Sequence, residues 1–284
     1  MILGIDVGGT HTDAVLIENF TIKKKSKVRT SEQNLLTSLL EVTNEIVDEE
    51  TVARLERVVL STTISTNAIV QNKVDRVGLM IVSGPGLHPS LLPVPDGAHF
   101  ISGYVNHRGI QVAGVDTREA ALLGAHFLSM GIEHVGIIGK FSPRNPEQEI
   151  TLKEIVAPQM RHISLGHRMS GHLNFPRRIA TTYLNEAVWR RYNHFVSEVL
   201  RFVRERKIEV PIYILKADGG TFDIEQSVEF PVQTILSGPA ASVMGILTVT
   251  DCREDAIALD IGGTTTDIAV FADGVPLLEA FGVT

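Results

Sequence analysis

The chain has 284 residues, of which 44% are hydrophobic and 21% charged, a balance that excludes a disordered chain and is typical of a globular protein. The formal net charge of -7 argues against binding to duplex nucleic acid, and the basic run at residues 23–25 fits a solvated strand face better than a nucleic-acid patch. Cys252 is the only cysteine, which excludes an internal disulfide and favours a reducing, cytoplasmic location. No apolar run approaches the length of a membrane span or a leader peptide, so we expect no membrane partner.

In chain order, short apolar runs bounded by glycine predict strands, and longer runs with helical spacing predict helices. The expected strands cover residues 1–7, 13–18, 57–61, 77–82, 134–139, 211–217, 256–261 and 267–271. The expected helices cover residues 31–47, 117–130, 145–156 and 176–207, with one short helix ending at Gln71 and a small-residue helix opening at Ser237. Ser31 and Thr117 are the expected N-caps of the first two. This alternation predicts an α/β fold with a mixed sheet.

One segment occurs twice. Residues 6–13, DVGGTHTD, recur at residues 260–267 as DIGGTTTD, and apolar strands flank both copies. A period of this length is not that of a solenoid, so the repeat predicts two lobes that open with the same turn.

The repeated turn has the composition of a phosphate-binding hairpin. Adjacent glycines let the backbone approach a ligand, and successive backbone N–H groups can form an anion-binding concavity. Asp6 and Asp260 precede the glycines at the end of a strand, where a carboxylate can hold Mg²⁺ through water, so they are also the catalytic candidates. An ordinary glycine hairpin is the alternative interpretation of each copy. The candidate nucleotide-binding residues are Gly8, Gly9, Thr10, Thr12, Gly262, Gly263, Thr264, Thr265 and Gly238.

Side chains next to these residues have two open interpretations. Thr12 and the residues Asp13, Thr266 and Asp267 either brace the hairpins or contact the ligand directly. Thr62, Thr63, Thr66 and Asn67 follow a strand, and they either line the substrate or phosphate side of a cleft or cap a helix. Asp218, Gly219 and Gly220 also follow a strand, and they either contribute to the substrate site or form an ordinary turn. The spacing of His162, His167 and His172 does not favour a metal site on one helical face.

Six segments in order resemble the hydantoinase A / 5-oxoprolinase family, within the actin, sugar kinase and heat-shock chaperone ATPase superfamily. They are residues 4–13, 61–68 (with Ser61 in place of the family's glycine), 144–147, 181–185, 218–220 and 237–240. The resemblance implies duplicated ribonuclease-H-like lobes with mixed sheets. It divides the chain into an N-terminal-type region at residues 1–175 and the start of a hydantoinase A-type region at residues 176–284. The superfamily's adenosine-binding segment follows the second hairpin, so we expect the second lobe to be incomplete and this chain to be a fragment.

The resemblance also implies a function, namely ATP-dependent opening of a cyclic amide or imide such as a hydantoin or 5-oxoproline. Phosphoryl transfer to the amide oxygen would activate the ring carbon, a step that needs positioning and charge neutralisation. ATP and Mg²⁺ are the implied cofactors, and a second hydantoinase-type subunit or another copy of the chain is the implied partner. We expect weak or absent nucleotide binding by this chain alone. The alternatives are a small-molecule kinase and a non-catalytic, actin-like assembly or activator protein.

Overall fold

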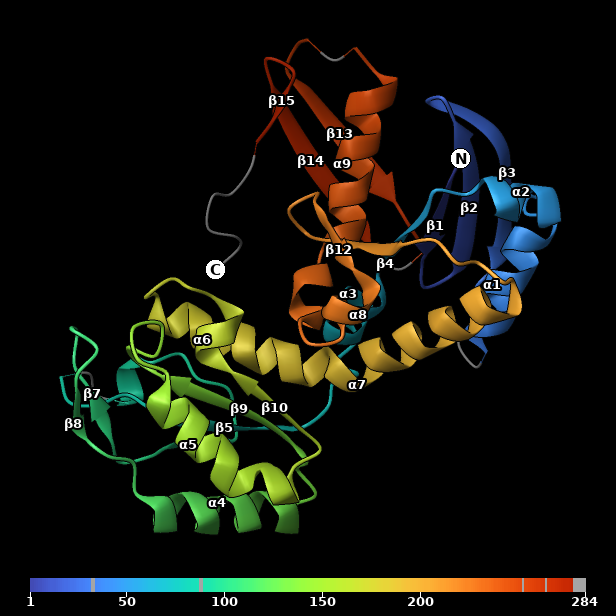
Figure 1. Cartoon of the computed structure of the whole chain (residues 1–284). Coiled ribbons are helices and arrows are strands. Elements are labelled where there is room, and N and C mark those ends of the chain that lie inside the picture. The colour runs from blue at the N-terminus through green and yellow to red at the C-terminus, as the bar shows by residue number, and fades with distance from the viewer. Residues whose placement is uncertain (32–33, 87–88, 252, 264, 278–284) are drawn as a thin grey trace. The chain divides into compact units, whose positions relative to one another are not determined.

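The computed structural model describes residues 1–31, 34–86, 89–251, 253–263 and 265–277, and the described chain forms two compact units (Figure 1). Unit 1 comprises Met1–Lys73 and Arg191–Thr284, and unit 2 comprises Val74–Arg190. Cys252 and Thr264 lie outside the described residues. The sequence-based region boundary at residue 175 stays a prediction. No helix among the described residues is long and apolar enough to cross a membrane.

Unit 1 contains a six-stranded mixed sheet in the order β12-β11-β4-β1-β2-β3. β1, β2 and β3 form an antiparallel meander, and β4 and β11 continue the sheet parallel to β1. The meander followed by parallel strands is the ribonuclease-H-like arrangement, and it confirms the predicted fold class. The strands are β1 (Ile2–Val7), β2 (His11–Glu18), β3 (Thr21–Arg29), β4 (Arg57–Thr62), β11 (Ile212–Leu215) and β12 (Thr221–Asp223).

One face of this sheet is covered by helices. Alternate residues of β1, namely Leu3, Ile5 and Val7, are buried in a core shared with α1 (Leu35–Asn44) and the second half of α7 (Phe175–Glu205). Each such side chain contributes about 1.5–3 kcal/mol by leaving water. Because successive side chains of a strand point to opposite faces, this packing directs Asp6 to the other face. The remaining short helices are α2 (Glu49–Arg54), α3 (Ile64–Val70), α8 (Ile224–Ser227) and the 3₁₀ turn at Pro231–Thr234.

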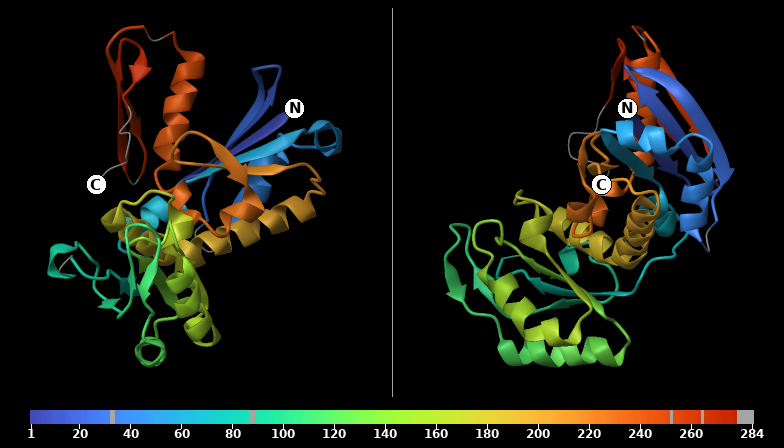
Figure 2. Two further views of the ribbon diagram at one scale, coloured as in Figure 1. Left: turned by 60° about the vertical axis from the view of Figure 1, so that its left-hand side comes forward. Right: turned by 45° about the vertical axis from the view of Figure 1, so that its right-hand side comes forward.

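The second copy of the repeat lies in a separate three-stranded sheet, β13-β14-β15. Both views of Figure 2 show α9 (Ser237–Val249) running alongside this sheet. The cross-strand pairs Ile257–Val270 and Leu259–Ile268 carry exposed side chains, and Leu259 and Ile268 are 59% and 68% exposed. This apolar face therefore has no covering layer among the described residues. The strands are β13 (Ala256–Ile261), β14 (Thr266–Ala272) and β15 (Val275–Pro276).

Unit 2 has a parallel sheet in the order β10-β9-β5-β6. Every residue of β5 and β9 is buried, as expected for parallel strands that are covered on both faces. α4 and α5 pack on one face, and the first half of α7 packs on the other. The main elements are β5 (Val77–Val82), β6 (Ala98–Phe100), α4 (Thr117–Ser129), β9 (His134–Gly139), α5 (Glu147–Val156) and β10 (His162–Leu165). The smaller ones are the 3₁₀ turns Pro89–Leu91 and Ala157–Gln159, β7 (Tyr104–Val105), β8 (Gln111–Ala113) and α6 (Gly166–Met169).

Both helix caps predicted from the sequence are wrong. The cap of α1 is Asn34, whose side chain accepts from the Thr37 N–H. The cap of α4 is Asp116, one residue before the predicted one, and its carboxylate accepts two first-turn N–H groups. A carboxylate or amide oxygen satisfies the open N–H groups at a helix start. Asp116 directly precedes the predicted Thr117, whereas Asn34 lies three residues after the predicted Ser31. The basic run is confirmed as a solvated strand face, because residues 23–25 are exposed on β3.

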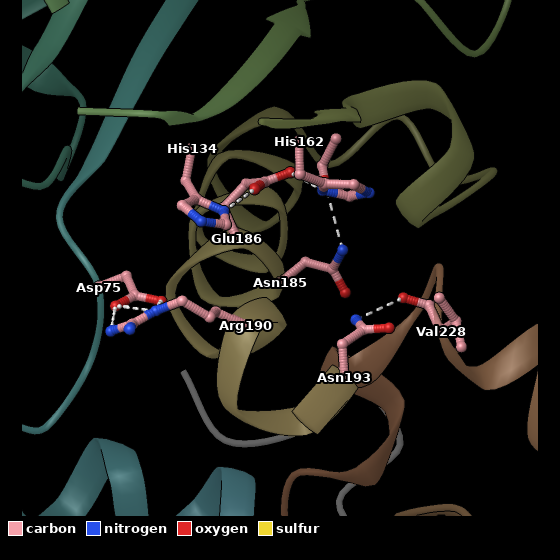
Figure 3. Close-up of polar contacts among 9 residues, drawn as sticks. Asp75, His134, His162, Asn185, Glu186, Arg190, Asn193 and Val228 are labelled. Carbon is pink, nitrogen blue, oxygen red and sulfur yellow. Dashed lines mark hydrogen bonds and ion pairs between the residues drawn. The ribbon is translucent and has the colours of Figure 1, made fainter. Parts of the chain in front are cut away.

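A buried acid joins α7 to the first residues of two strands (Figure 3). Glu186 is completely buried and hydrogen-bonds His134 at the start of β9 (3.2 Å) and His162 at the start of β10 (2.7 Å). The His162 ring stacks on Trp189, with the ring centroids 4.3 Å apart. One residue earlier on α7, the Asn185 amide donates to Ser164 of β10 (2.9 Å). These contacts position α7 on the sheet of unit 2.

We expect Glu186→Gln to destabilise the protein by about 1–3 kcal/mol at pH 7, because hydrogen bonds to the charged carboxylate are lost. Burial alone would raise the pKa of Glu186, but hydrogen bonds from His134 and His162, the attraction of His162 and a hydrogen bond from Ser164 outweigh it and hold the pKa below 4.5. A lowered folded pKa stabilises the protein above the unfolded pKa, and this contribution is lost as the pH falls through the folded value. Urea unfolding followed by the fluorescence of Trp189, the single tryptophan, measures both effects.

The exposed Glu205 on the same helix provides the matched control, Glu205→Gln. If the free energy of unfolding fell equally with decreasing pH in wild type and Glu186→Gln, the stabilising role of the ionised Glu186 would be contradicted.

Candidate functional site

The candidate residues of unit 1 gather where its parallel strands end. The register of β1 and β4 pairs Asp6 with Ser61 and Val7 with Thr62, and β11 lies parallel to β4 on its other side. The carboxyl ends of β1, β4 and β11 therefore share one edge of the sheet. Ligand sites of α/β proteins form at such an edge.

Hydrogen bonds within the hairpin and from Thr30 stabilise the first turn. The Gly8 N–H donates to the His11 carbonyl (3.0 Å), and a Cβ on Gly8 would lie 2.8 Å from that oxygen, so only glycine fits. The Thr30 hydroxyl donates to the Gly8 carbonyl, and Thr30 Oγ1 lies 2.9 Å from Thr12 Oγ1. Thr12 is fully buried and braces the turn. The next two residues of the turn, Gly9 and Thr10, are exposed and accessible to a ligand.

The second hairpin repeats the hydrogen bond that closes the first and the pairing of its strands. The Gly262 N–H donates to the Thr265 carbonyl (3.0 Å), as Gly8 does to His11. Asp260 pairs with Asp267 across the strands, as Asp6 pairs with Asp13. The duplication predicted from the sequence is therefore present in the backbone hydrogen bonding.

The two turns approach each other. A Cβ on Gly263 would lie 2.6 Å from Thr10 Cγ2, so Gly263 allows the close approach of the first turn. Asp260 is near enough for its charge to raise the pKa of Asp6. The structure therefore brings the two predicted aspartates and both glycine turns into one place within unit 1.

Electrostatics at this place favour a cation. Loss of solvation raises the pKa of Asp6 although part of its side chain remains exposed. Ser61 and Lys27 lower that pKa, whereas Asp13 and Asp260 raise it further. Loss of solvation, followed by the charge of Asp260, also raises the pKa of Asp267. A divalent cation between the acids would relieve this repulsion.

Ser242 of α9 is a site residue that the sequence reasoning missed. Its hydroxyl donates to Asp260 Oδ2 at 2.5 Å. Ser242 lies four residues after Gly238, so both belong to one face of the helix. Helical spacing counted from the predicted Gly238 would have identified it.

The threonine segment connects β4 to α3. Thr62 Oγ1 accepts from the Ile64 N–H (3.2 Å), which gives Thr62 a helix-start role. Thr63 occupies the N-cap position without capping a backbone N–H, and it instead accepts from the Asn67 amide (3.0 Å). The side chains of Thr63 and Asn67 thus bond to each other, whereas the Thr62 hydroxyl also donates to the Val7 carbonyl at the end of β1 (3.3 Å).

The same segment also positions the start of α9. Thr66 Oγ1 accepts from the N–H of Leu236, which has the left-handed φ of 66° just before the helix. The Ser237 hydroxyl donates to the Thr62 carbonyl (3.1 Å). A Cβ on Gly238 would lie 3.0 Å from Thr63 Cγ2, so a small residue is needed there. Through these contacts the first-lobe edge orients the helix that carries Ser242.

Asp218, Gly219 and Gly220 form the turn between β11 and β12. Asp218 accepts from the Gly220 N–H (2.8 Å) and pairs with Lys216 (2.9 Å). Lys216, followed by the Gly220 N–H, holds the pKa of Asp218 below its usual value despite partial desolvation. Gly219 has a φ of 80°, which favours glycine. The geometry is that of an Asp–Gly turn, and a Cβ on Gly219 would touch Met244 of α9 at 3.4 Å.

Residues 2–160 match the family model described as hydantoinase/oxoprolinase N-terminal region, and residues 178–281 match the model described as hydantoinase/oxoprolinase. The chain belongs to the hydantoinase/oxoprolinase family. This confirms the resemblance inferred from the motifs.

Relatives in this family are similar along nearly the whole chain. Caprolactamase subunit alpha of Pseudomonas jessenii is 25% identical over 96% of this chain and 43% of its own length. Acetone carboxylase beta subunit of Xanthobacter autotrophicus is 23% identical over 96% of this chain and 43% of its own length. 5-Oxoprolinase of Saccharomyces cerevisiae is 29% identical over 50% of this chain and 10% of its own length. The chain therefore spans less than half the length of these relatives.

Two solved structures have the same fold. Nucleotide-free acetone carboxylase superposes with a TM-score of 0.84 at 21% identity, over 97% of this chain and 44% of that one. ATP-dependent caprolactamase of Pseudomonas jessenii superposes with a TM-score of 0.73 at 21% identity, over 95% of this chain and 43% of that one.

Proposed function

We propose that this chain is the ATP-binding part of a hydantoinase/oxoprolinase-family enzyme that opens a cyclic amide or imide through phosphoryl activation. The observation that carries the proposal is the meeting of the two glycine turns, in which Gly263 lies against Thr10 and Asp260 lies near Asp6. The names of two relatives, caprolactamase and 5-oxoprolinase, indicate substrates that are ring amides. These names support a substrate of the hydantoin or 5-oxoproline type for this chain.

The residues present fit a magnesium ion bound largely through water. The described residues contain no group of three or more histidine, cysteine, aspartate or glutamate side chains that could hold a metal, which disfavours a cage made only of protein ligands. Mg²⁺ commonly binds one or two carboxylates and completes its shell with waters and phosphates. Asp6 and Asp260 supply two such carboxylates. The two carboxylates repel each other, so a cation bound between them would be stabilised.

ATP, when bound with magnesium, would supply the phosphoryl group that activates the amide oxygen and the cation that neutralises its charge. The backbone N–H groups of Gly9 and Gly263 would donate hydrogen bonds to phosphate oxygens, joined by the hydroxyls of Thr10 and Thr265. Gly8 and Gly262, whose N–H groups close the two turns, would shape these sites. Thr264 is a further candidate outside the described residues. Asp6 and Asp260 would orient water, while Ser242 fixes the carboxylate of Asp260. In the overall reaction ATP and water are consumed, the ring C–N bond breaks, the nitrogen takes up a proton, water supplies the new carboxylate oxygen, and ADP and phosphate are released.

The rest of the enzyme would lie in regions that the longer relatives have. The uncovered apolar face of β13 and β14 supports a larger second lobe. Relatives named as subunits of caprolactamase, acetone carboxylase and acetophenone carboxylase support a second subunit as the partner. We expect weak or absent ATP binding by this chain alone, because the adenosine-binding segment would lie in the larger second lobe, and a titration showing tight binding would contradict that placement of the segment.

The test measures ATP turnover by the complete gene product with hydantoins and 5-oxoproline, following phosphate release and ring opening together. We expect ring opening only with ATP and in step with phosphate release. Phosphate release without ring opening would refute the hydrolase, and a stable phosphorylated product would favour the kinase alternative. Acetone with bicarbonate is a necessary further arm, because the relatives include acetone carboxylase.

A further inference from the structure

Thr30, which directly follows β3, is bonded to the first glycine turn at two places. Its hydroxyl donates to the Gly8 carbonyl at 2.9 Å, and its backbone N–H donates to the Thr10 carbonyl at 2.9 Å. These two carbonyls flank Gly9. Thr30 belongs to neither copy of the repeat and to none of the segments that resemble the family. A residue outside the motif therefore fixes both ends of the exposed part of the turn.

The bond from Thr30 to Gly8 sets the direction of the next N–H group. A trans peptide group is planar, so its C=O and its N–H point in opposite directions. The described chain has no cis peptide bond, and the Gly8 carbonyl accepts from the Thr30 hydroxyl, so the Gly9 N–H points away from Thr30. Gly9 is exposed, and no group among the described residues accepts from its N–H. An open backbone N–H of this kind is available to an anion.

The peptide group between Gly8 and Gly9 needs such a restraint. Neither residue has a Cβ, so this peptide can turn over as a unit at little steric cost. Turned over, it would present its carbonyl oxygen where its N–H now lies, and that oxygen would repel a phosphate. The bond from the Thr30 hydroxyl stabilises the orientation in which the N–H faces outward.

The Thr30 hydroxyl is itself held by Thr12. Thr12 Oγ1 lies 2.9 Å from Thr30 Oγ1, and Thr12 is fully buried. A carbonyl oxygen can only accept, so the single hydroxyl proton of Thr30 goes to Gly8. The Thr12 hydroxyl must then donate to Thr30. The three residues form a chain of hydrogen bonds in one direction, in which each bond strengthens the next.

The similarity between the two copies extends beyond residues 6–13. The reversals that follow β2 and β14 lie at the spacing of the repeat, and in both of them two residues have a left-handed φ, namely Asn19 (49°), Phe20 (59°), Asp273 (49°) and Gly274 (77°). Counted at the same spacing, Thr30 corresponds to Thr284, which lies outside the described residues. The sequence therefore has a threonine at this position after both turns.

We propose that Thr30 is a positioning residue of the nucleotide site, which holds the Gly8–Gly9 peptide with its N–H toward a phosphate oxygen of ATP. The inference rests on the proposed function, because it needs a phosphate at the first turn. It does not depend on which ring amide is opened. Thr30 contacts the turn and not the ligand, so it acts through the direction of the Gly9 N–H.

Isothermal titration calorimetry of the complete gene product with Mg-ATP tests this role. Thr30→Val keeps the shape and the backbone N–H of the residue and removes only the hydroxyl. We expect it to raise the dissociation constant by about tenfold or more, because a hydrogen bond to a charged phosphate is weakened. Thr30→Ser restores the hydroxyl and should bind Mg-ATP nearly as the wild type does.

Two further variants separate positioning from folding. Thr21→Val is the matched control, because it removes a hydroxyl that donates to the Asn19 carbonyl (3.4 Å) at the other end of β3, and it should bind as the wild type does. Thr12→Val should weaken binding less than Thr30→Val. It should add little in the Thr30→Val background, because Thr12 acts through the Thr30 hydroxyl. Melting temperatures measured without nucleotide should differ little among these variants.

Equal binding by Thr30→Val and wild type would overturn this role for Thr30 and leave the proposed function standing. Failure of Thr30→Ser to restore binding, or a large fall in melting temperature that accompanies the loss of binding in Thr30→Val, would do the same. A wild type that binds no Mg-ATP would refute the proposed function, and the role of Thr30 with it.

Discussion

Asp6→Asn in the complete enzyme should reduce ATP-dependent turnover by at least about a hundredfold, because a preorganised charged group at the phosphates is lost. The same change should leave the melting temperature unchanged or slightly higher. Desolvation, Asp13 and Asp260 raise the pKa of Asp6 above 3.8, even though Ser61 and Lys27 oppose them. A raised folded pKa means that the ionised carboxylate destabilises the fold at neutral pH. Asparagine removes that charge with little change in shape.

The sign of the stability effect can be checked by pH. A group with a raised folded pKa destabilises the protein fully above that value, and the penalty disappears below the unfolded pKa near 3.8. Differential scanning calorimetry should therefore show the variant and wild type converging in acid. Asp251→Asn, which removes an exposed carboxylate paired with Arg253, is the matched control and should affect neither turnover nor stability.

Two results would contradict this role for Asp6. Turnover that survives within a few-fold would mean that the cation is held elsewhere. A marked fall in melting temperature would mean that Asp6 supports the fold and not the reaction. Activity lost together with a retained or higher melting temperature separates a functional carboxylate from a structural one.

The sequence could predict the hairpins because their information is local. In each copy, one glycine N–H closes the turn on the carbonyl three residues later, so the motif contains its own hydrogen bond. The strand before each turn alternates or is wholly apolar, and its bounds follow from that pattern. β5 and β9 were located to the residue for the same reason.

Other features could not be read from the sequence because they depend on contacts distant in the chain. Glu186 lies 52 residues from His134, and nothing in the spacing of the histidines indicates that they share one acid. β3 was expected only as a solvated strand face at residues 23–25, and its bounds were not predicted because an exposed edge strand rich in lysine has no apolar alternation. The threonine segment reaches Leu236 across 170 residues, so its part in starting α9 appears only in three dimensions.

Arg178→Met should destabilise the protein by about 1.5–3 kcal/mol or more, because hydrogen bonds from a charged, buried group are lost. Arg178 is 1% exposed and makes three hydrogen bonds to the loop after β9. Burial lowers its pKa, and the charge of Glu149, which is also fully buried, partly offsets that effect. Removing the guanidinium takes the side-chain donor from the Lys140 carbonyl and one donor from the Gly139 carbonyl, which keeps its bond from Ser142. Glu149 loses a nearby positive charge but keeps its ion pair with His167. Urea unfolding followed by Trp189 fluorescence measures the loss.

The variants can distinguish geometry from charge. Arg178→Lys retains the charge but cannot make the planar set of three bonds, so it should recover only part of the stability. Combining Arg178→Met with Glu149→Gln should cost less than the sum of the single changes, because Arg178 and Glu149 both hold Gly139 and the second change removes support that the first has already weakened. Arg204→Met, an exposed arginine on the same helix, should cost little. A loss below about 1 kcal/mol for Arg178→Met would mean that water replaces the guanidinium and that the loop needs no such support. A large loss would instead make Arg178 the residue through which α7 fixes the loop that carries Lys140.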